Sequence, residues 1–420
     1  MEKHLLSKST FIRGVQCLKS LYLNKKRPFL RDKIPQERLL VFRRGHKVGE
    51  LAQQLFPGGI NMSPGHPSAY RKAILNTAEK IAEGFPVIYE AGFQHEQVMI
   101  LLDILVHNEK GWHAYEVKSS GGISDTYLMD AALQYHVIKG TGLDISGISI
   151  IHIDREYVRD DEIDIHKLFR IVDVTDEALS RQEFVAEQIL KEKETMLLKS
   201  SPKIDVGPHC RNPYDCDFIG HCWKNEPVPE EKDGLEHFDK NLVSDLISDT
   251  GNIAFLKLLS LRHAIPEYQG THPYQEIPYG FSLTVETQKT YNIFGYTSNP
   301  EPGLKEELFN HLANVDAVIT FGQGSLSANL LPGHMKIIDL EELLNEDSEL
   351  RNINDGESLL EKIFSLSGAG KPGTAYTSDA VCTHHYLEEY ESEEVKADIQ
   401  KYAMEWVDGI KSLYNFLLTS

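Results

Sequence analysis

The sequence, 420 residues long, predicts a mixed α/β protein with two domains, because a chain of this length can bury more than one core. Two observations carry this prediction. Strand-like, apolar or β-branched runs alternate with helical periodicity in the first half of the chain. Their order is three strands, one amphipathic helix and one buried strand, at residues 86–93, 97–107, 112–118, 125–140 and 145–154.

Helical patterns flank this α/β core on both sides. Residues 1–60 predict helices, with Ser7 or Ser9 as N-caps, and two further helices are predicted at 68–84 and 176–199. The segment VPEEKDG is the expected linker. The predicted division is an N-terminal domain, a linker and a C-terminal domain, at residues 1–227, 228–234 and 235–420.

The most informative segment is a hairpin over residues 98–120, VMILLDILVHNEKGWHAYEVKSS. Asp103 lies on its first strand, and Glu116 and Lys118 lie on its second. Because side chains alternate along a strand, Glu116 and Lys118 point to the same face. Two carboxylates and one ammonium would meet there, which suits a divalent metal ion and phosphodiester hydrolysis. A surface hairpin with a simple Glu–Lys pair is the alternative.

The spacing D-x12-E-x-K on a hairpin resembles that of the PD-(D/E)XK nuclease superfamily. The resemblance implies a restriction-endonuclease-like core in the N-terminal domain. It implies that Asp103 and Glu116 bind Mg²⁺ or Mn²⁺, and that Lys118 is the catalytic lysine.

The RecB-like branch of that superfamily implies three more site residues. Glu90, at the end of FPVIYE, would be a further metal ligand, and His46 on an early helix would be another. Gln134 stands where these nucleases carry a glutamine that touches the site or the DNA, next to Tyr135. An ordinary surface glutamine and an ordinary helix histidine are the alternatives.

The cysteines form a second pattern. Cys210, Cys216 and Cys222 make a C-x5-C-x5-C motif in a polar loop, whereas Cys17 is far upstream and Cys382 stands alone. The N-terminus lacks the apolar segment of a signal peptide, so a cytoplasmic protein is expected. In a reducing compartment, clustered cysteines bind metals or clusters more often than they form disulfides. Four thiolates suit an iron–sulfur cluster or zinc.

A resemblance over most of the chain extends this interpretation. The chain is similar to a poorly characterised bacterial family that joins an iron–sulfur PD-(D/E)XK domain to an exonuclease-like domain. It implies that Cys17 joins Cys210, Cys216 and Cys222 around a structural 4Fe–4S cluster, with zinc as the alternative. The segments that carry it are SKSTFIRGVQCLKSLYL, FRRGHKVGELAQQLFPGG, YEVKSS, YVRDDEIDIHKLFRIVDVT and CRNPYDCDFIGHCW.

The C-terminal domain resembles the exonuclease-like part of the same family through AIP at 264–266 and PYQEIP at 273–278. This implies an RNase H-like fold of the DEDD exonuclease type. The expected first pair of acidic ligands is missing, because the sequence there is Lys257, Leu258 and Leu259. Lysine and leucine do not coordinate Mg²⁺. Since Tyr402 and Glu405 remain and Asp316 is the single candidate for a third acid, we expect an inactive domain.

Charge distribution separates the two ends of the chain. The formal net charge is −20, yet residues 1–50 contain 13 Lys and Arg against 4 Asp and Glu. Such a basic arm can contact phosphates without reading sequence, or can be a solvated helical face. Its cations are Lys19, Lys25, Lys26, Arg27, Arg31, Lys33, Arg38, Arg43, Arg44 and Lys47.

Together these patterns predict a metal-dependent DNA nuclease that acts on single-stranded DNA or DNA ends. The acidic C-terminal domain suits contacts with a protein partner, and no apolar run is long enough to span a membrane. A non-catalytic nucleic-acid-binding or assembly subunit is the alternative, and a nuclease that acts on RNA is a third.

Overall fold

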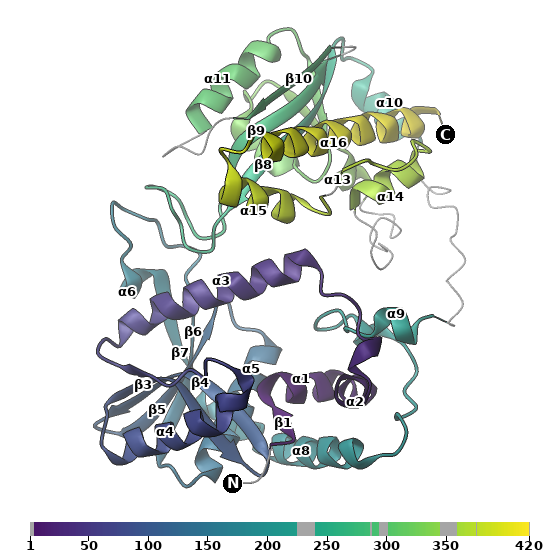
Figure 1. The fold of residues 1–420 in the computed structure, drawn as a ribbon. Coiled ribbons are helices and arrows are strands. Elements are labelled where there is room, and N and C mark those ends of the chain that lie inside the picture. Colours follow the sequence, from purple (N-terminus) through teal and green to yellow (C-terminus); the bar gives the residue numbers. More distant parts are fainter. Residues whose placement is uncertain are drawn as a thin grey trace. The chain divides into compact units, whose positions relative to one another are not determined.

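The computed structural model describes residues 4–224, 240–285, 288–293, 301–344, 359–374 and 376–419. The chain forms two compact units. Unit 1 contains Met1–Glu226 and Ala264–Pro273, and unit 2 contains Pro227–His263 and Tyr274–Ser420. Both units are mixed α/β, as predicted (Figure 1). The predicted linker lies outside the described residues.

A seven-stranded mixed sheet organises the described part of unit 1. Its order is β2-β3-β4-β5-β6-β7, and β1 pairs with β4. β3, β4 and β5 are antiparallel neighbours, whereas β5 and β6 run parallel and are joined through the helix α5. The strands are β1 (Leu6–Ser7), β2 (Ile60–Asn61), β3 (Val87–His95), β4 (Val98–Asn108), β5 (Gly111–Lys118), β6 (Ile145–Ile153) and β7 (Phe169–Asp173).

Helices cover this sheet. The helix α4 packs on β3, α5 packs on β3, β4 and β6, and α3 lies against β5 (Figure 1). The helices of unit 1 are α1 (Lys8–Gln16), α2 (Leu18–Lys26), α3 (Gln36–Ala52), α4 (Tyr70–Ala82), α5 (Asp125–Gly140), α6 (Ile165–Leu168), α7 (Thr175–Ser180), α8 (Gln182–Leu197) and α9 (Ile219–Cys222), with 3₁₀ turns at Pro28–Leu30, Gln53–Leu55, Pro67–Ala69 and Pro208–Cys210.

Three local predictions need correction. The strand expected over 86–93 is β3, which continues two residues further, to His95. The helix expected over 176–199 is divided into α7 and α8 at Arg181. The helix expected to be amphipathic, α5, is buried on most of its surface, because the sheet covers one side and α1, α7 and α8 cover the other.

A segment expected in the C-terminal domain belongs to unit 1. Residues Ala264–Pro273 follow β8 in sequence but cluster with unit 1. The backbone N–H of Arg159 donates to the carbonyl of Thr271 at 3.0 Å, and its guanidinium donates to the carbonyl of Pro266 at 2.8 Å. The chain therefore leaves and re-enters unit 1 after Glu226.

Unit 2 contains a five-stranded sheet with the order β10-β9-β8-β11-β12 in its described part. β8, β9 and β10 are antiparallel neighbours, and β8, β11 and β12 are parallel. The elements are α10 (Lys240–Ile247), β8 (Ile253–Arg262), β9 (Glu276–Val285), β10 (Gln288–Ile293), α11 (Glu301–His311), β11 (Ala317–Thr320), α12 (Gly324–Leu330), β12 (Lys336–Asp339), α13 (Leu340–Leu344), α14 (Leu359–Leu366), α15 (Asp379–Glu389) and α16 (Glu393–Thr419).

Among the described residues, no helix is both long enough and apolar enough to span a membrane.

One buried carboxyl group lies where α8 packs on α1. Glu192 is fully buried, and a Cβ atom added to Gly14 of α1 would lie 2.2 Å from its side-chain oxygen. The missing side chain of Gly14 therefore leaves the space that Glu192 occupies. Burial raises the pKa of Glu192 to about 9, although Gln188 donates a hydrogen bond to it at 3.0 Å.

We expect Glu192→Gln to stabilise unit 1 at neutral pH. The folded protein holds this carboxyl protonated up to about pH 9, whereas the unfolded chain ionises it above pH 4.5. The free energy of unfolding therefore falls as the pH rises between these values. The neutral amide removes that cost, roughly 2–4 kcal/mol in the free energy of unfolding at pH 7. Chemical denaturation at pH 7.5 and pH 5 checks this, with exposed Glu187→Gln as control. An equal gain at both pH values would contradict it.

Candidate active site and cysteine pocket

Glu116 is the centre of the polar site in unit 1. It lies near the end of β5, and its side chain is 2% exposed. Its Oε1 accepts hydrogen bonds from the ammonium groups of Lys8 at 2.6 Å and Lys118 at 2.9 Å, and its Oε2 accepts from the amide of Gln134 at 2.8 Å. Burial alone would raise the pKa of Glu116, but Lys118 and Lys8 hold it well below its usual value. The carboxylate therefore stays charged although it is buried.

Lys118 is held on two sides by carboxylates. Besides Glu116, it pairs with Asp130 of α5 at 2.6 Å, and its ammonium lies 4.8 Å from the ring centre of Tyr127. Burial alone would lower the pKa of Lys118, but Glu116 and Asp130 raise it above its usual value. Lys118 is thus a fixed cation and hydrogen-bond donor, not a base that accepts a proton at neutral pH.

Three carboxylates stand in register across three neighbouring strands. The pairs Tyr89–Ile104 and Ala91–Leu102 set Glu90 of β3 opposite Asp103 of β4. The pairing of β4 with β5 ends at Ile104–Tyr115, and the next residues are Asp103 and Glu116. Carboxylates side by side in a sheet repel one another, so this row is stable only with cations or protons between its members.

Asp103 shows the effect of that repulsion. Its Oδ2 accepts a hydrogen bond from the backbone N–H of Val117 at 2.6 Å, at the point where the ladder between β4 and β5 has ended. Burial and the neighbouring Glu116 raise the pKa of Asp103 to about 8, against the opposing effect of Lys8. At neutral pH this carboxyl holds a proton that a bound cation would displace.

Glu90 has an uncommon backbone conformation for a residue within a strand. Its φ angle is 53°, in the left-handed region. Burial raises the pKa of its carboxyl, and the charge of Glu116 adds to this, while Lys8 and His46 act in the opposite direction. Residues held in this conformation cluster at functional sites.

The predicted residues thus fall into two groups. Lys118 and Gln134 donate hydrogen bonds to Glu116, Asp103 accepts one from the backbone next to Glu116, and Glu90 lies in the same row of carboxylates. His46 is exposed on α3, and only its electrostatic effect on Glu90 links it to the site. Tyr135 is buried in the core instead of facing the carboxylates, and its hydroxyl accepts a hydrogen bond from Lys139.

Lys8 and Asp130 are site residues that sequence reasoning missed. Lys8 is 108 positions away from Glu116, and no pattern within the sequence connects the two. Asp130 could have been found, because it lies four residues before Gln134 on the same helix, and residues at that spacing share a face.

The side chains of the carboxylate row have the chemistry that a divalent cation needs. Carboxylate oxygens are the ligands that Mg²⁺ and Mn²⁺ prefer, and Glu90, Asp103 and Glu116 supply them from adjacent strands. Among the described residues, no three His, Cys, Asp or Glu side chains already form a tight metal-binding group. In this structure the ammonium groups of Lys8 and Lys118 neutralise Glu116.

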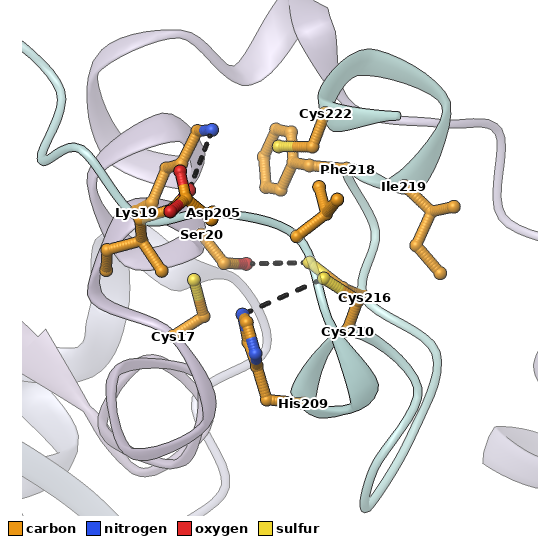
Figure 2. A pocket seen from close by; sticks show the side chains of 12 residues that line it. Cys17, Lys19, Ser20, Asp205, His209, Cys210, Cys216, Phe218, Ile219 and Cys222 are labelled. Carbon is orange, nitrogen blue, oxygen red and sulfur yellow. Dashed lines mark hydrogen bonds between the residues drawn. The ribbon is translucent and has the colours of Figure 1, made fainter. Parts of the chain in front are cut away.

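All four cysteines expected to act together line one pocket. Figure 2 shows Cys17, which follows α1, facing Cys210, Cys216 and Cys222 from the loop around α9. None forms a disulfide, and burial raises the pKa of the Cys17 and Cys222 thiols. The Sγ of Cys216 lies 3.2 Å from the hydroxyl of Ser20. Cys382 is buried in unit 2, apart from this set.

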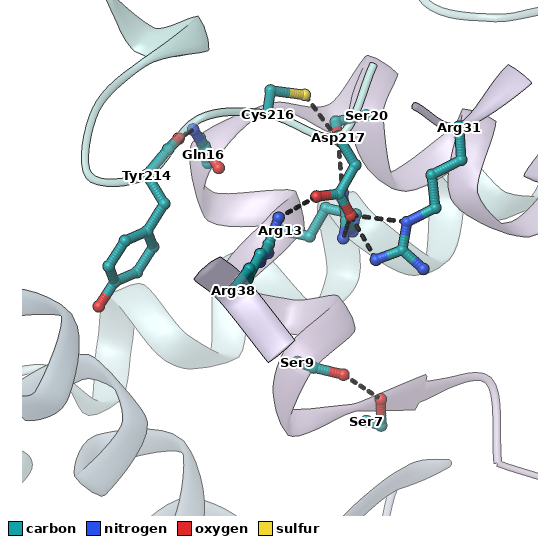
Figure 3. Close-up of polar contacts among 10 residues, drawn as sticks. All are labelled: Ser7, Ser9, Arg13, Gln16, Ser20, Arg31, Arg38, Tyr214, Cys216 and Asp217. Atoms are coloured by element: carbon teal, nitrogen blue, oxygen red, sulfur yellow. Dashed lines mark hydrogen bonds and ion pairs between the residues drawn. The ribbon is translucent and has the colours of Figure 1, made fainter. Parts of the chain in front are cut away.

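An ion cluster around the buried Asp217 holds the cysteine loop in place. Asp217, next to Cys216, pairs with the guanidinium groups of Arg13, Arg31 and Arg38, at 2.5 Å in the case of Arg13 (Figure 3). Burial alone would raise the pKa of Asp217, but the three arginines hold it below its usual value. Two arginines of the expected phosphate-binding arm, Arg31 and Arg38, are thus engaged with Asp217.

In unit 2, a lysine occupies the place where an acidic ligand was expected. The side chain of Lys257 on β8 is 2% exposed and pairs with Asp379 of α15 at 2.7 Å. The hydroxyl of Tyr402 donates to the other oxygen of Asp379 at 2.7 Å, and the Lys257 ammonium lies 4.2 Å from the ring centre of Trp406. The lysine supplies the positive charge at this carboxylate.

The remaining acidic candidates of unit 2 bind backbone groups. Glu405 accepts hydrogen bonds from the N–H groups of Gly373 and Thr374, at 3.0 and 2.9 Å. Asp316 accepts from the N–H groups of Gly251 and Asn252, at 3.0 and 2.8 Å. Both carboxylates therefore have structural partners.

We expect Asp217→Asn to destabilise the cysteine loop strongly. Removal of the negative charge leaves three guanidinium groups together without a counter-charge, which costs roughly 2–4 kcal/mol in the free energy of unfolding of unit 1. Thermal and chemical denaturation measure the loss. Asp215→Asn is the matched control, because Asp215 is largely exposed and its ion pair with Arg211, at 3.4 Å, lies at the surface. Equal stability of the two variants would show that the arginine cluster does not hold the loop.

Comparison with known proteins identifies one segment of the chain. Residues 255–325 match a family described as a domain of unknown function, DUF2779. The match begins within β8 and ends in α12, so it lies in unit 2 apart from Ala264–Pro273, and it includes Lys257 but neither the carboxylate row nor the cysteine pocket. No curated protein matches the chain.

Proposed function

We propose that the protein is a metal-dependent DNA nuclease whose site is the carboxylate row of Glu90, Asp103 and Glu116 with Lys118. The observation that carries this proposal is that acidic residues on three adjacent strands form one row, in which Glu116 accepts a hydrogen bond from a lysine held as a cation. Oxygen ligands beside a fixed cation suit the hydrolysis of a phosphodiester, where negative charge grows on the phosphate and the leaving oxygen.

Each residue then has a distinct task. Asp103 and Glu116 would hold Mg²⁺ or Mn²⁺, with Glu90 as a further ligand; the metal supplies charge stabilisation and an acidified water. Lys118 donates hydrogen bonds towards the phosphate, and Asp130 keeps it protonated and oriented. Gln134 orients Glu116 through its amide.

The order of elements supports the predicted core. The antiparallel β3, β4 and β5, followed by the buried helix α5 and the parallel strand β6, match the restriction-endonuclease-like arrangement that the sequence predicts. In unit 2, three antiparallel strands followed by two parallel ones in the order β10-β9-β8-β11-β12 match an RNase H-like sheet. We infer that unit 2 is a relative of DEDD exonucleases that has lost catalysis, since Lys257 neutralises Asp379.

We propose a 4Fe–4S cluster in the cysteine pocket. Four free thiols line it, and they come from two parts of the sequence almost 200 residues apart. A cluster there would join the start of unit 1 to the end of its main segment. Zinc needs the same donors in a tetrahedron, so metal content separates the two.

The surface of the N-terminal helices supports a single-stranded nucleic acid as the substrate, and the choice of DNA rests on the family resemblance. Phe29 and Phe42 are 75% and 49% exposed, among the lysines and arginines of residues 25–47. Aromatic rings beside basic side chains are typical of surfaces that bind single-stranded nucleic acid. The acidic unit 2 favours a second candidate function, an assembly subunit that docks a protein partner. In either case we infer action in the cytoplasm.

We expect the purified protein to cleave labelled single- or double-stranded DNA with Mg²⁺ or Mn²⁺ and not with EDTA. Lys118→Ala and Asp103→Ala should each lower the rate at least about 100-fold, because a transition-state donor or a metal ligand is lost. Lys110→Ala, at the turn of the same hairpin, is the control and should retain full activity. Full activity in Lys118→Ala would refute the site, and comparison of DNA with RNA tests the substrate.

We expect anaerobically purified protein to be brown and to contain about four irons per chain, as a 4Fe–4S cluster requires. Cys216→Ala should lose the colour and expose the loop to proteolysis, since cluster binding contributes to folding. Cys382→Ala is the control and should keep its iron. A colourless preparation that contains about one zinc per chain would show that the cysteines bind zinc instead of a 4Fe–4S cluster.

A further inference from the structure

The helix α1 joins the two sites of unit 1. It begins at Lys8, whose ammonium contacts Glu116, and it is followed by Cys17, which lines the cysteine pocket. Its nine residues make a rod of about 13 Å, at 1.5 Å per residue. A single short helix thus has one end at each site.

The end of α1 near the cysteines is attached to the cysteine loop by side chains. Gln16 donates hydrogen bonds to the carbonyls of His209 at 2.9 Å and Tyr214 at 2.6 Å. Arg13 pairs with Asp217 at 2.5 Å and donates to the hydroxyl of Ser20, which contacts Cys216 (Figure 3). The C-terminal end of α1 is therefore attached to the loop that carries three of the four cysteines.

The other end of α1 delivers a second cation to the carboxylate row. Lys8 and Lys118 share the same oxygen of Glu116. Lys118 comes from β5 itself, the strand that carries Glu116, whereas Lys8 stands where β1, which pairs with β4, passes into α1. A divalent cation that binds Glu116 meets the Lys8 ammonium as a competitor of like charge.

We propose that Lys8 is a positioning residue of the carboxylate row, and that α1 makes the cation affinity of this row depend on the state of the cysteine pocket. With the pocket intact, Lys8 stays on Glu116 and limits how tightly a divalent cation binds. When the pocket is disrupted, the loop releases Arg13 and Gln16, and Lys8 moves away. This inference rests on the proposed function, since it assigns a regulator to the same site.

The test measures Mn²⁺ binding by electron paramagnetic resonance, without substrate, in the full-length protein. Lys8→Met should tighten Mn²⁺ binding at least about fivefold, because a competing cation is removed. Lys8→Arg, which keeps the charge, should bind as the unaltered protein does. Gln16→Ala, which removes two hydrogen bonds between α1 and the loop but leaves every cysteine, should tighten binding in the same direction.

The double variant decides whether the two effects share one route. If Gln16 acts through Lys8, then Lys8→Met with Gln16→Ala should bind Mn²⁺ as Lys8→Met alone does, since effects on one pathway are not additive. Val15→Ala, on the same helix and more exposed than Gln16, is the control for a general disturbance of α1. Additive shifts, or equal effects of Gln16→Ala and Val15→Ala, would overturn the proposal.

Hydrogen exchange separates this proposal from the proposed function. Amides of residues 8–12 should exchange at least about tenfold faster in Gln16→Ala than in Val15→Ala, because the helix has lost two hydrogen bonds to the loop. This readout needs no metal and no cleavage. Absent Mn²⁺ binding with the expected exchange would refute the nuclease site but leave the attachment of α1, whereas unchanged exchange would refute the attachment itself.

Discussion

The buried charge of Glu116 is the constraint on which unit 1 depends. An isolated carboxylate in this position would be very costly, so its two oxygens are matched by Lys8, Lys118 and Gln134. These partners come from α1, β5 and α5, which are separate elements of the unit. The need to neutralise one side chain therefore fixes two helices against the sheet. It also explains why α5, buried on most of its surface, still carries the polar residues Asp130 and Gln134 in its interior face.

Much of the carboxylate site could be predicted from local sequence. The alternation of a strand is enough to place Glu116 and Lys118 on one face, and the hairpin brings Asp103 beside them. Lys8 could not be predicted, because its contact with Glu116 depends on how a distant helix packs. The backbone of Glu90 was also beyond sequence reasoning, since its positive φ arises where the pairing of β3 and β4 is interrupted.

The cysteine pocket shows the same division between local pattern and long-range packing. The spacing of Cys210, Cys216 and Cys222 indicated that they bind one metal ion or cluster, and the family resemblance added Cys17 to them. The role of Asp217 could not be predicted from the sequence, because its ion pairs with Arg13, Arg31 and Arg38 form only when distant segments pack together. In unit 2 the absence of an acidic residue at position 257 was evident, but its replacement by an ion pair with Asp379 required the fold.

The route of the chain limits how this protein can be divided. The segment Ala264–Pro273 returns to unit 1 from within the sequence of unit 2, so the polypeptide passes between the units three times. A gene fragment that ends at residue 226 would encode the carboxylate row and the four pocket cysteines, yet Arg159 would lose its hydrogen bonds to Pro266, Gly270 and Thr271. The two units are therefore not independent modules joined by a tether. A single recombination crossover between the two units would therefore separate Ala264–Pro273 from the rest of unit 1.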